Sequence, residues 1–260
     1  MSSQLNSGSP LAVKLGSSDN STISVEASSS SKDSLITLTS LSWNIEGVKR
    51  NLYSLKRVTS LIKPNLIFIS EPQLFISDLT NCMSLFRGEY YCELNSEDKF
   101  DPEIAMLKTH AKGGTMVMWQ VSLDSFIQIH PVHTSSFLPV VYSPPGCPVS
   151  VHIALYMPTS GKETDFLEEL SSLGACLDEL SEKYKDCLFF IRGDANVNKN
   201  NKDRMRIFQN FLSSHSLTQV PTNHNTYHHF LGGGSFDSDI DVIIHSVTLS
   251  PVQIMNQLLR

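Results

Sequence analysis

The spacing of apolar residues along this chain predicts strands and helices in alternation. Strands, marked by apolar or β-branched runs, are predicted over Leu35–Trp43, Leu66–Ile69, Thr115–Val121, Phe126–His133, Val149–Tyr156, Cys187–Ile191, Thr226–Leu231 and Ile240–Ile244. Helices, marked by apolar residues at every third or fourth position, are predicted over Leu52–Ile62, Phe166–Tyr184 and Met205–Leu212. A strand–helix–strand start followed by a β-rich middle indicates an α/β fold.

The N-terminal segment differs from the rest of the chain. It is rich in serine, with an unbroken run from Ser28 to Ser31, and its few large apolar residues follow no period. Such a segment buries too little surface to offset the entropy lost on ordering it. We therefore expect a disordered tail over residues 1–34 and one folded domain over residues 35–260.

Composition and charge narrow the class of protein. The chain has 20 basic and 26 acidic residues, a net charge of −6, which excludes binding to nucleic acid through bulk positive charge but not through a local basic patch. No segment approaches the ~18 apolar residues of a membrane span, and the N-terminus lacks the apolar core of a secretory signal. The five cysteines are widely spaced and form no C-x-x-C pair. These features predict an intracellular protein in a reducing compartment, with no membrane partner.

Polar side chains gather at the ends of the predicted strands. The residues at or next to a strand end are Asn44, Glu71, Tyr156, Asp194, Asn196 and Asp241. In α/β sheets, ligands bind beyond the strand ends, where loops present side chains from a rigid base. Several carboxylates without matching cations suit a hard divalent metal, because Mg²⁺ takes oxygen ligands and often needs only one or two carboxylates.

Some of these features also have ordinary structural explanations. Glu71 alone could be a solvated loop residue, and Asp194 could cap a helix. Asp241 is harder to explain in this way, because a carboxylate within an apolar strand needs a partner or a metal. The glycine run Gly232–Gly234 lacks the Gly-Lys-Ser/Thr ending of a phosphate-binding loop, which favours a hairpin or turn.

Five short motifs follow one another in a particular order. They are Ser42–Gly47 (SWNIEG), Ile69–Pro72 (ISEP), Tyr156–Pro158 (YMP), Arg192–Asn196 (RGDAN) and Ser238–Asp241 (SDID). In this order and strand context the chain resembles the endonuclease/exonuclease/phosphatase superfamily, and most of all the endonuclease domain of non-LTR (LINE-like) retrotransposons and the related apurinic-site nucleases. The resemblance implies a four-layered α/β sandwich, with two packed mixed sheets flanked by helices. It also implies phosphodiester hydrolysis that depends on Mg²⁺ or Mn²⁺.

The resemblance further implies a role for each matching residue. Glu71 matches the metal ligand of the family, with Asn44 beside it. Asp194 matches the residue that orients or activates the attacking water. Asn196 matches a stabiliser of the transition state, and Tyr156 matches a phosphate contact.

The remaining matches lie towards the C-terminus. Thr226 matches a further hydroxyl of the phosphate site, and Asp241 matches the carboxylate that pairs with a histidine in an S-D-H motif. That motif does not occur before Arg260. His245 shares the strand face of Asp241 but lies about 13 Å along it, at ~3.3 Å per residue. We therefore expect a domain that is truncated in its C-terminal strand region and impaired in catalysis.

A cluster of basic residues follows the Asp194 motif, and it comprises Lys199, Lys202, Arg204 and Arg206. We expect these residues either to contact a DNA backbone or to form a solvated helix face. The leading hypothesis is DNA nicking for a mobile element, in the nucleus if the target is genomic DNA, with a reverse-transcriptase domain in the parent polyprotein as a possible partner. Two alternatives stay open: a phosphoesterase of the same fold acting on a small or lipid substrate, of the inositol phosphatase or sphingomyelinase type, and a non-catalytic remnant.

Overall fold

The computed structural model covers the chain between Leu38 and Val247 with few gaps. The described residues are 38–99, 101, 103, 106, 108, 111–198, 200–221, 227–231, 234–238 and 241–247, and those within 227–238 are described by their backbone alone. The predicted tail over residues 1–34, Lys199 and Thr226 therefore lie outside the described residues. No helix in the described part of the chain has the length and apolar character needed to span a membrane.

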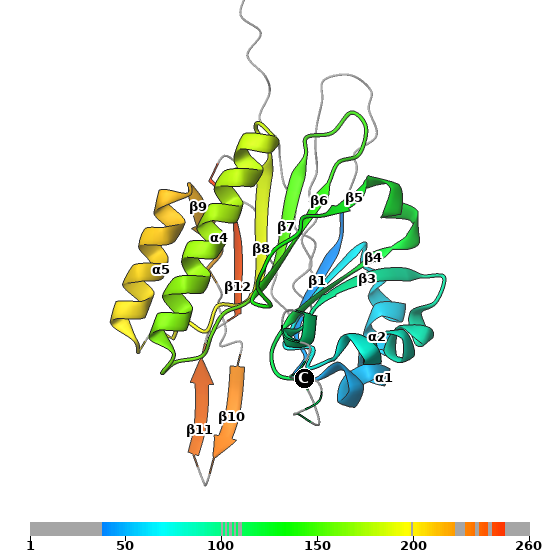
Figure 1. Ribbon diagram of the computed structural model, residues 1–260, viewed down its shortest axis with the longest axis horizontal. Helices are drawn as coiled ribbons and strands as arrows, with labels where there is room; N and C mark the ends of the chain where they lie inside the picture. The colour runs from blue at the N-terminus through cyan, green and yellow to red at the C-terminus, as the bar shows by residue number, and fades with distance from the viewer. Residues whose placement is uncertain are drawn as a thin grey trace, which may run out of the picture.

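One sheet has four strands in the order β1–β2–β4–β3. These strands are β1 (Ser40–Asn44), β2 (Leu66–Ser70), β3 (Tyr90–Asn95) and β4 (Thr115–Gln120). β1 and β2 run parallel, and β4 is antiparallel to both of its neighbours. Helices α1 (Val48–Ile62) and α2 (Ile76–Met83) cover the outer face of this sheet (Figure 1).

The other sheet has six strands in the order β5–β6–β7–β8–β12–β9. These strands are β5 (Ile127–Ile129), β6 (Phe137–Tyr142), β7 (Ser150–Tyr156), β8 (Leu188–Asp194), β9 (Leu217–Gln219) and β12 (Asp241–Ser246). β7 and β8 run parallel, and the other neighbouring pairs are antiparallel. Helices α4 (Glu163–Lys183) and α5 (Lys202–Ser214) lie on its outer face (Figure 1).

Three apolar cores separate four layers. Strand β2 shows how one sequence serves two of them, because side chains alternate between the faces of a strand. Ile67 and Ile69 pack towards α1 and α2, whereas Leu66 and Phe68 pack between the two sheets. A third core lies between α4, α5 and the six-stranded sheet. The four-layered α/β sandwich expected from the sequence is therefore confirmed.

The sequence predictions failed in the segment between β4 and β7. The strand predicted over Phe126–His133 is present only at β5 (Ile127–Ile129), and Phe126 is the last residue of a 3₁₀ helix over Val121–Phe126. Strand β6 was not predicted, and it contains Pro139, which normally argues against an interior strand. The Pro139 carbonyl accepts from the backbone N of His130 at 3.1 Å, so the proline nitrogen faces β5. The pairing of β5 with β6 ends at Ile129 and Val140, so Pro139 lies just beyond the paired residues. The N–H that proline lacks therefore removes no hydrogen bond between the two strands.

Gly234, the described residue of the glycine run, begins a strand that pairs in a two-stranded sheet, whereas Gly232 and Gly233 lie outside the described residues. Strands β10 (Tyr227–Leu231) and β11 (Gly234–Ser238) pair antiparallel, with Leu231 opposite Gly234. The hairpin projects from the lower edge of the molecule in Figure 1.

Candidate active site

The carboxyl ends of strands from both sheets meet at one edge of the sandwich. The parallel register of β7 and β8 places Tyr156, the last residue of β7, beside Asp194, the last residue of β8. Strand β12 begins with Asp241, directly opposite Asp194. In the other sheet, β1 ends at Asn44, and Glu71 directly follows β2. The polar residues that the sequence places at strand ends therefore gather at one edge.

The two sheets are joined at this edge by a hydrogen bond between residues far apart in the sequence. In β8, Phe189 and Ile191 pack beneath the helices, so the strand period turns Asp194 towards the other sheet. There Asp194 Oδ2 accepts a hydrogen bond from Asn44 Nδ2 at 3.0 Å. The bond fixes the carboxylate between the two sheets.

Gly193 allows the sheets to approach this closely. Its φ is +134°, and a Cβ atom here would lie 2.0 Å from the carbonyl oxygen of Leu155 and 2.6 Å from Ser70 Oγ. The Ser70 hydroxyl donates to the same Leu155 carbonyl at 2.8 Å. The glycine of the Arg192–Asn196 motif is therefore required by packing at the site as well as by its backbone conformation.

A pocket of about 560 Å³ opens at this edge, which we call the site pocket. It is lined by Asn44, Glu46, Arg50, Glu71, Gln73, Tyr156, Thr159, Ser160, Asp194, Asn196 and Asn198. Five of the residues singled out in the sequence, Asn44, Glu71, Tyr156, Asp194 and Asn196, thus line one cavity. The other lining residues were missed as site residues, although each lies within or shortly after one of the quoted motifs.

Strained backbone is concentrated around the site pocket. Four of its lining residues have positive φ angles: Glu46 (47°), Gln73 (50°), Asn196 (51°) and Glu71 (56°). The left-handed conformation costs a non-glycine residue of order 1 kcal/mol, and such residues cluster at functional sites. The Glu71 turn is held by backbone hydrogen bonds, one of them from its own N–H to the carbonyl of Gly114 at 3.1 Å.

Asp194 is buried and lies close to other carboxylates. It is 2% exposed, and burial raises its pKa well above the usual aspartate range. The negative charges of Asp241 and Glu71 raise the pKa further, whereas hydrogen bonds from the Asn196 backbone N–H and the Asn44 amide oppose the shift. A carboxylate with a raised pKa is a better proton acceptor near neutral pH than an ordinary aspartate.

Glu71 and Tyr156 form a second polar pair in the site pocket. Burial raises the pKa of Glu71, as does the charge of Glu46, whereas hydrogen bonds from Gln73 and Tyr156 lower it. Gln73 Nε2 donates to Glu71 Oε1 at 3.1 Å. Burial also raises the pKa of Tyr156, and the neighbouring charges of Glu71 and Asp194 add to the shift. Tyr156 therefore keeps its proton and acts as a hydrogen-bond donor.

Asn196 is held in place by both its backbone and its side chain. Its backbone N–H donates to Asp194 Oδ1 at 2.8 Å, and its Nδ2 donates to the carbonyl of Met157 at 2.8 Å. The amide has a second hydrogen on Nδ2, which no described residue accepts. Asn196 thus links the loop after β8 to the loop after β7.

The donor set of the site pocket fits a hard divalent cation. Asn44 Oδ1 is buried and has no hydrogen-bond partner among the described residues, although a buried acceptor is normally satisfied. Glu71 supplies a carboxylate in the same pocket. No group of three or more His, Cys, Asp or Glu side chains within the described ranges could hold a metal. The ligands would therefore be one carboxylate, one amide oxygen and water, which is a common Mg²⁺ arrangement.

The basic cluster expected to contact DNA is not a single surface. Arg204 is wrong as a DNA contact, because its side chain is 0% exposed. Its guanidinium donates to the carbonyls of Pro158 and Thr159 and to Glu163 and stacks 3.8 Å from the centroid of the Phe166 ring. The helix pattern did not reveal this burial, because the partners of Arg204 lie about 40 residues earlier in the chain.

The other two described cations of that cluster, Lys202 and Arg206, stay at the surface. Arg206 is exposed and pairs with Asp203 at 3.3 Å. Lys202 is exposed and lines a second pocket beside the site pocket.

Asp241 lies at the start of β12, and not inside an apolar strand as the sequence suggested. It is the first residue of the strand and is half-buried. His245 lies at the other end of β12, opposite Phe190, and its Nδ1 lies 2.8 Å from the carbonyl oxygen of Ser246. His245 and Asp241 thus lie four positions apart in one strand, as the prediction assumed.

Solved structures resemble this chain, although no protein-family profile and no curated protein matches it. The endonuclease domain of TRAS1, a telomere-specific non-LTR retrotransposon, matches with a TM-score of 0.56 at 16% identity, over 80% of this chain and 84% of that domain. The AP endonuclease LMAP from Leishmania major matches with a TM-score of 0.60 at 14% identity, over 80% and 79% of the two chains. The fold is that of the endonuclease/exonuclease/phosphatase superfamily.

A third neighbour of the same superfamily is the 3′ phosphatase NExo from Neisseria, bound to a product DNA hairpin. It matches with a TM-score of 0.56 at 14% identity, over 79% of this chain and 85% of that chain. The neighbours are thus two endonucleases and a phosphatase. The TM-scores of 0.56 to 0.60, at identities of 14 to 16%, establish a shared fold.

Proposed function

We propose that this protein is a divalent-metal-dependent phosphodiesterase that nicks DNA, of the non-LTR retrotransposon endonuclease type. The observation that carries the proposal is the convergence of Asn44, Glu71, Tyr156 and Asp194 in one pocket where the strands of both sheets end. Neighbours of the same fold include structures with a DNA hairpin product and, for TDP2 of D. rerio, a single-stranded DNA product. These complexes support DNA as the substrate class.

The metal would be held by the Glu71 carboxylate and Asn44 Oδ1. When bound, it supplies charge neutralisation at the non-bridging oxygens of the phosphate and assistance to the leaving oxygen. The Asn44 amide already donates to Asp194 through Nδ2. The Asn44 side chain would therefore contact both the metal, through Oδ1, and the proposed base Asp194, through Nδ2.

The remaining residues divide the other tasks of phosphodiester hydrolysis. Asp194 accepts the proton of the attacking water, a task favoured by its raised pKa. Asn196 offers an amide hydrogen to the developing charge of the phosphate, and Tyr156 offers its hydroxyl hydrogen when it leaves the Glu71 carboxylate. These neutral donors bind the phosphate without adding anions to a pocket already lined by Glu46, Glu71 and Asp194.

Nicking of supercoiled plasmid, combined with a thermal-shift titration of Mg²⁺ and Mn²⁺, tests this proposal. Wild-type protein should nick the plasmid and gain thermal stability with either metal, because a ligand that binds only the folded state stabilises it. Glu71→Gln should abolish most of the metal-induced shift and lower nicking at least about 10²-fold. Glu182→Gln, on the exposed face of α4, removes the same charge and should change neither.

Three results would count against the proposal. Release of phosphate from inositol phosphates without nicking would favour the small-substrate phosphoesterase. Hydrolysis of a lipid phosphodiester alone would favour the sphingomyelinase type. Absence of both metal binding and hydrolysis would leave a non-catalytic domain of this fold.

A further inference from the structure

The site pocket continues into a second pocket of similar size. The second pocket also measures about 560 Å³, and it is lined by Ser160, Asn198, Asn200, Asn201, Lys202 and Asp203. Ser160 and Asn198 line both pockets. The two cavities are therefore contiguous, and together they form a groove from the start of α1, past Asp194, to the start of α5.

The charge along this groove is uneven. The site pocket carries the carboxylates of Glu46, Glu71 and Asp194, and Arg50 is the only lysine or arginine among its described lining residues. In the second pocket, Lys202 is the corresponding cation. Carboxylates repel a polyanion, so a strand of nucleic acid would need cations on each side of the reacting phosphate. Arg50 lines the site pocket, and Lys202 lines the second pocket.

Both cations are available to bind a ligand. The side chains of Arg50 and Lys202 are exposed, and neither side chain makes a hydrogen bond or ion pair with a described residue. Their neighbours are engaged, because Lys49 pairs with Asp78 at 2.7 Å and Arg206 pairs with Asp203 at 3.3 Å. Arg50 and Lys202 are therefore open to a ligand, whereas Lys49 and Arg206, which lie near them in the sequence, are each paired with an aspartate.

We propose that this groove binds a nucleic-acid strand, with Arg50 and Lys202 each contacting a phosphate that flanks the reacting phosphodiester. The assignment rests on the proposed function and narrows its substrate to a chain of successive phosphates. Asn198 and Ser160, at the junction of the pockets, offer neutral hydrogen-bonding groups to the strand between the two cations. A phosphodiester without flanking phosphates would occupy the site pocket alone.

Fluorescence anisotropy with labelled DNA tests the assignment without requiring hydrolysis. Arg50→Ala and Lys202→Ala should each weaken binding of a duplex oligonucleotide by about threefold at low salt. Each should also lower the slope of log Kd against log salt by about one. The loss should be smaller for a dinucleotide, which has no flanking phosphates to lose.

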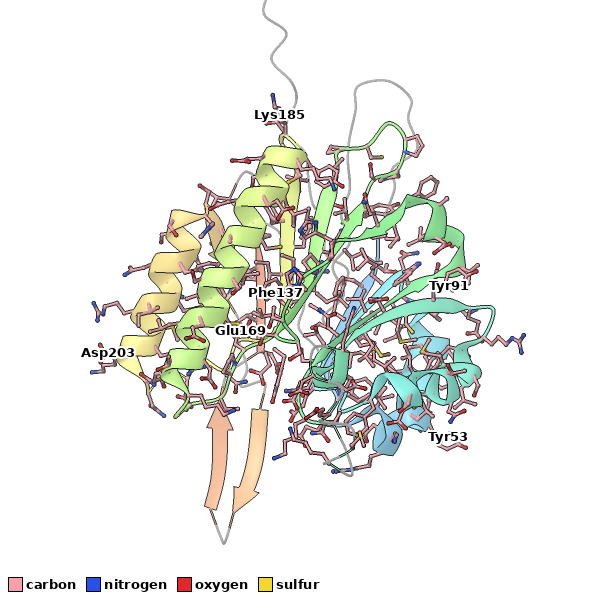
Figure 2. All side chains as sticks on the ribbon, in the orientation of Figure 1. Tyr53, Tyr91, Phe137, Glu169, Lys185 and Asp203 are labelled. Carbon is pink, nitrogen blue, oxygen red and sulfur yellow. The ribbon has the colours of Figure 1, made fainter. Side chains whose placement is uncertain are left out.

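Two matched controls remove the same charge elsewhere. Arg57 lies on α1 about two turns beyond Arg50, is exposed and lines neither pocket. Lys185 follows α4 at the end of the helix far from the groove, whereas Asp203 marks the groove end of α5 (Figure 2). Arg57→Ala and Lys185→Ala should leave DNA binding within about twofold of the wild type.

Two outcomes would overturn the assignment. In the first, the groove variants lose no more affinity than the controls, or lose as much on the dinucleotide as on the duplex. In the second, the wild-type protein does not bind the duplex. Hydrolysis of bis(p-nitrophenyl) phosphate, measured in parallel, tests phosphodiesterase activity itself. Active protein with indifferent groove variants would reject the groove alone, and DNA binding without hydrolysis would reject the proposed activity alone.

Discussion

At the scale of single residues, Asp194 lowers the stability of the fold at the position where the proposed mechanism places a base. It is 2% exposed and directly opposite Asp241, so its ionised form is disfavoured by burial and by a like charge. In the free protein it is held by the Asn44 amide and the Asn196 backbone. A charge at this position adds nothing to the stability of the fold, and a carboxylate here suits the proposed role of Asp194 as a base.

Asp194→Asn should therefore stabilise the protein and inactivate it. The oxygen of the new asparagine still accepts from the Asn196 N–H. Its NH₂ group can donate to Asn44 Oδ1 if the Asn44 side-chain amide rotates by about 180°. Asn44 Oδ1 has no partner among the described residues. We expect a gain of about 1–2 kcal/mol in the free energy of unfolding at neutral pH without metal, or ~2–8 °C in Tm. Plasmid nicking should fall at least about 10²-fold.

The pH dependence and a control sharpen this test. Because the folded-state pKa of Asp194 is raised, ionisation of this carboxyl group destabilises the folded protein. The destabilisation is absent below the unfolded pKa of about 4 and develops as the pH rises through the folded pKa. The advantage of Asp194→Asn should thus vanish near pH ~4. Asp186→Asn, at an exposed residue with φ of +60° that asparagine tolerates, should leave Tm unchanged. A Tm for Asp194→Asn at or below that of Asp186→Asn would contradict the argument.

At the scale of elements, Arg204 ties α5 to the loop between β7 and α4. Its guanidinium binds the carbonyls of Pro158 and Thr159, and also Glu163 in the first turn of α4. The same loop places Thr159 and Ser160 in the wall of the site pocket. Arg204 therefore positions the pocket wall from inside and takes no part in contacting DNA.

Replacing Arg204 separates this role from that of a surface cation. Arg204→Met keeps an aliphatic side chain beside Phe166 but leaves buried carbonyls without a donor, and we expect a loss of about 2–4 kcal/mol in unfolding free energy. Arg204→Lys should recover part of that loss, because an ammonium can still donate to a carbonyl. Arg206→Met, at an exposed ion pair on the same helix, should cost less than about 0.5 kcal/mol. Urea denaturation of the three variants measures these differences, and equal losses at the two positions would refute the positioning role.

At the scale of the whole molecule, the space between the sheets contains a buried basic pair. His152 in β7 stacks between Phe68 and Phe190, with ring centroids 6.1 and 5.0 Å away. Arg192 in β8 lies over the same two phenylalanine rings, with its Nη1 atom 3.4 Å from His152 Nδ1. Burial lowers the pKa of His152 well below its usual value, and the charge of Arg192 lowers it further.

The protein should therefore lose stability in mild acid. Because the folded-state pKa of His152 is lowered, its contribution is present above the unfolded pKa of about 6.5 and is lost as the pH falls below it. The loss approaches ~1.4 kcal/mol for each pH unit until the folded pKa is reached. His152→Gln should be less stable than wild type at pH ~8, with the gap narrowing as the pH falls.

Urea denaturation at a series of pH values measures this effect. His133→Gln, at an exposed histidine, is the control and should follow the wild-type pH profile. Parallel profiles for wild type and His152→Gln would show that the buried histidine is not the source of acid sensitivity.

Local pattern alone was sufficient for the strands that carry the candidate site. Strand periodicity places Asn44, Tyr156 and Asp194 at strand ends, and parallel strands bring such ends to one edge. The family motifs lead to the same residues and to the four layers. Strand β6 escaped prediction because Pro139 is tolerated only where the register with β5 ends.

Tertiary structure decided whatever depends on contacts across the chain. The hydrogen bond from Asn44 to Asp194 joins residues 150 positions apart, and the burial of Arg204 depends on a loop about 45 residues earlier. No local pattern distinguishes Arg204 from Arg206, since both lie on one helix as basic residues, yet one is buried and the other is 70% exposed. The sequence thus determines which residues can perform the chemistry, because face and strand end follow from local periodicity. Which cations remain free for a ligand is decided by folding, because pairing and burial depend on residues that only the fold brings together.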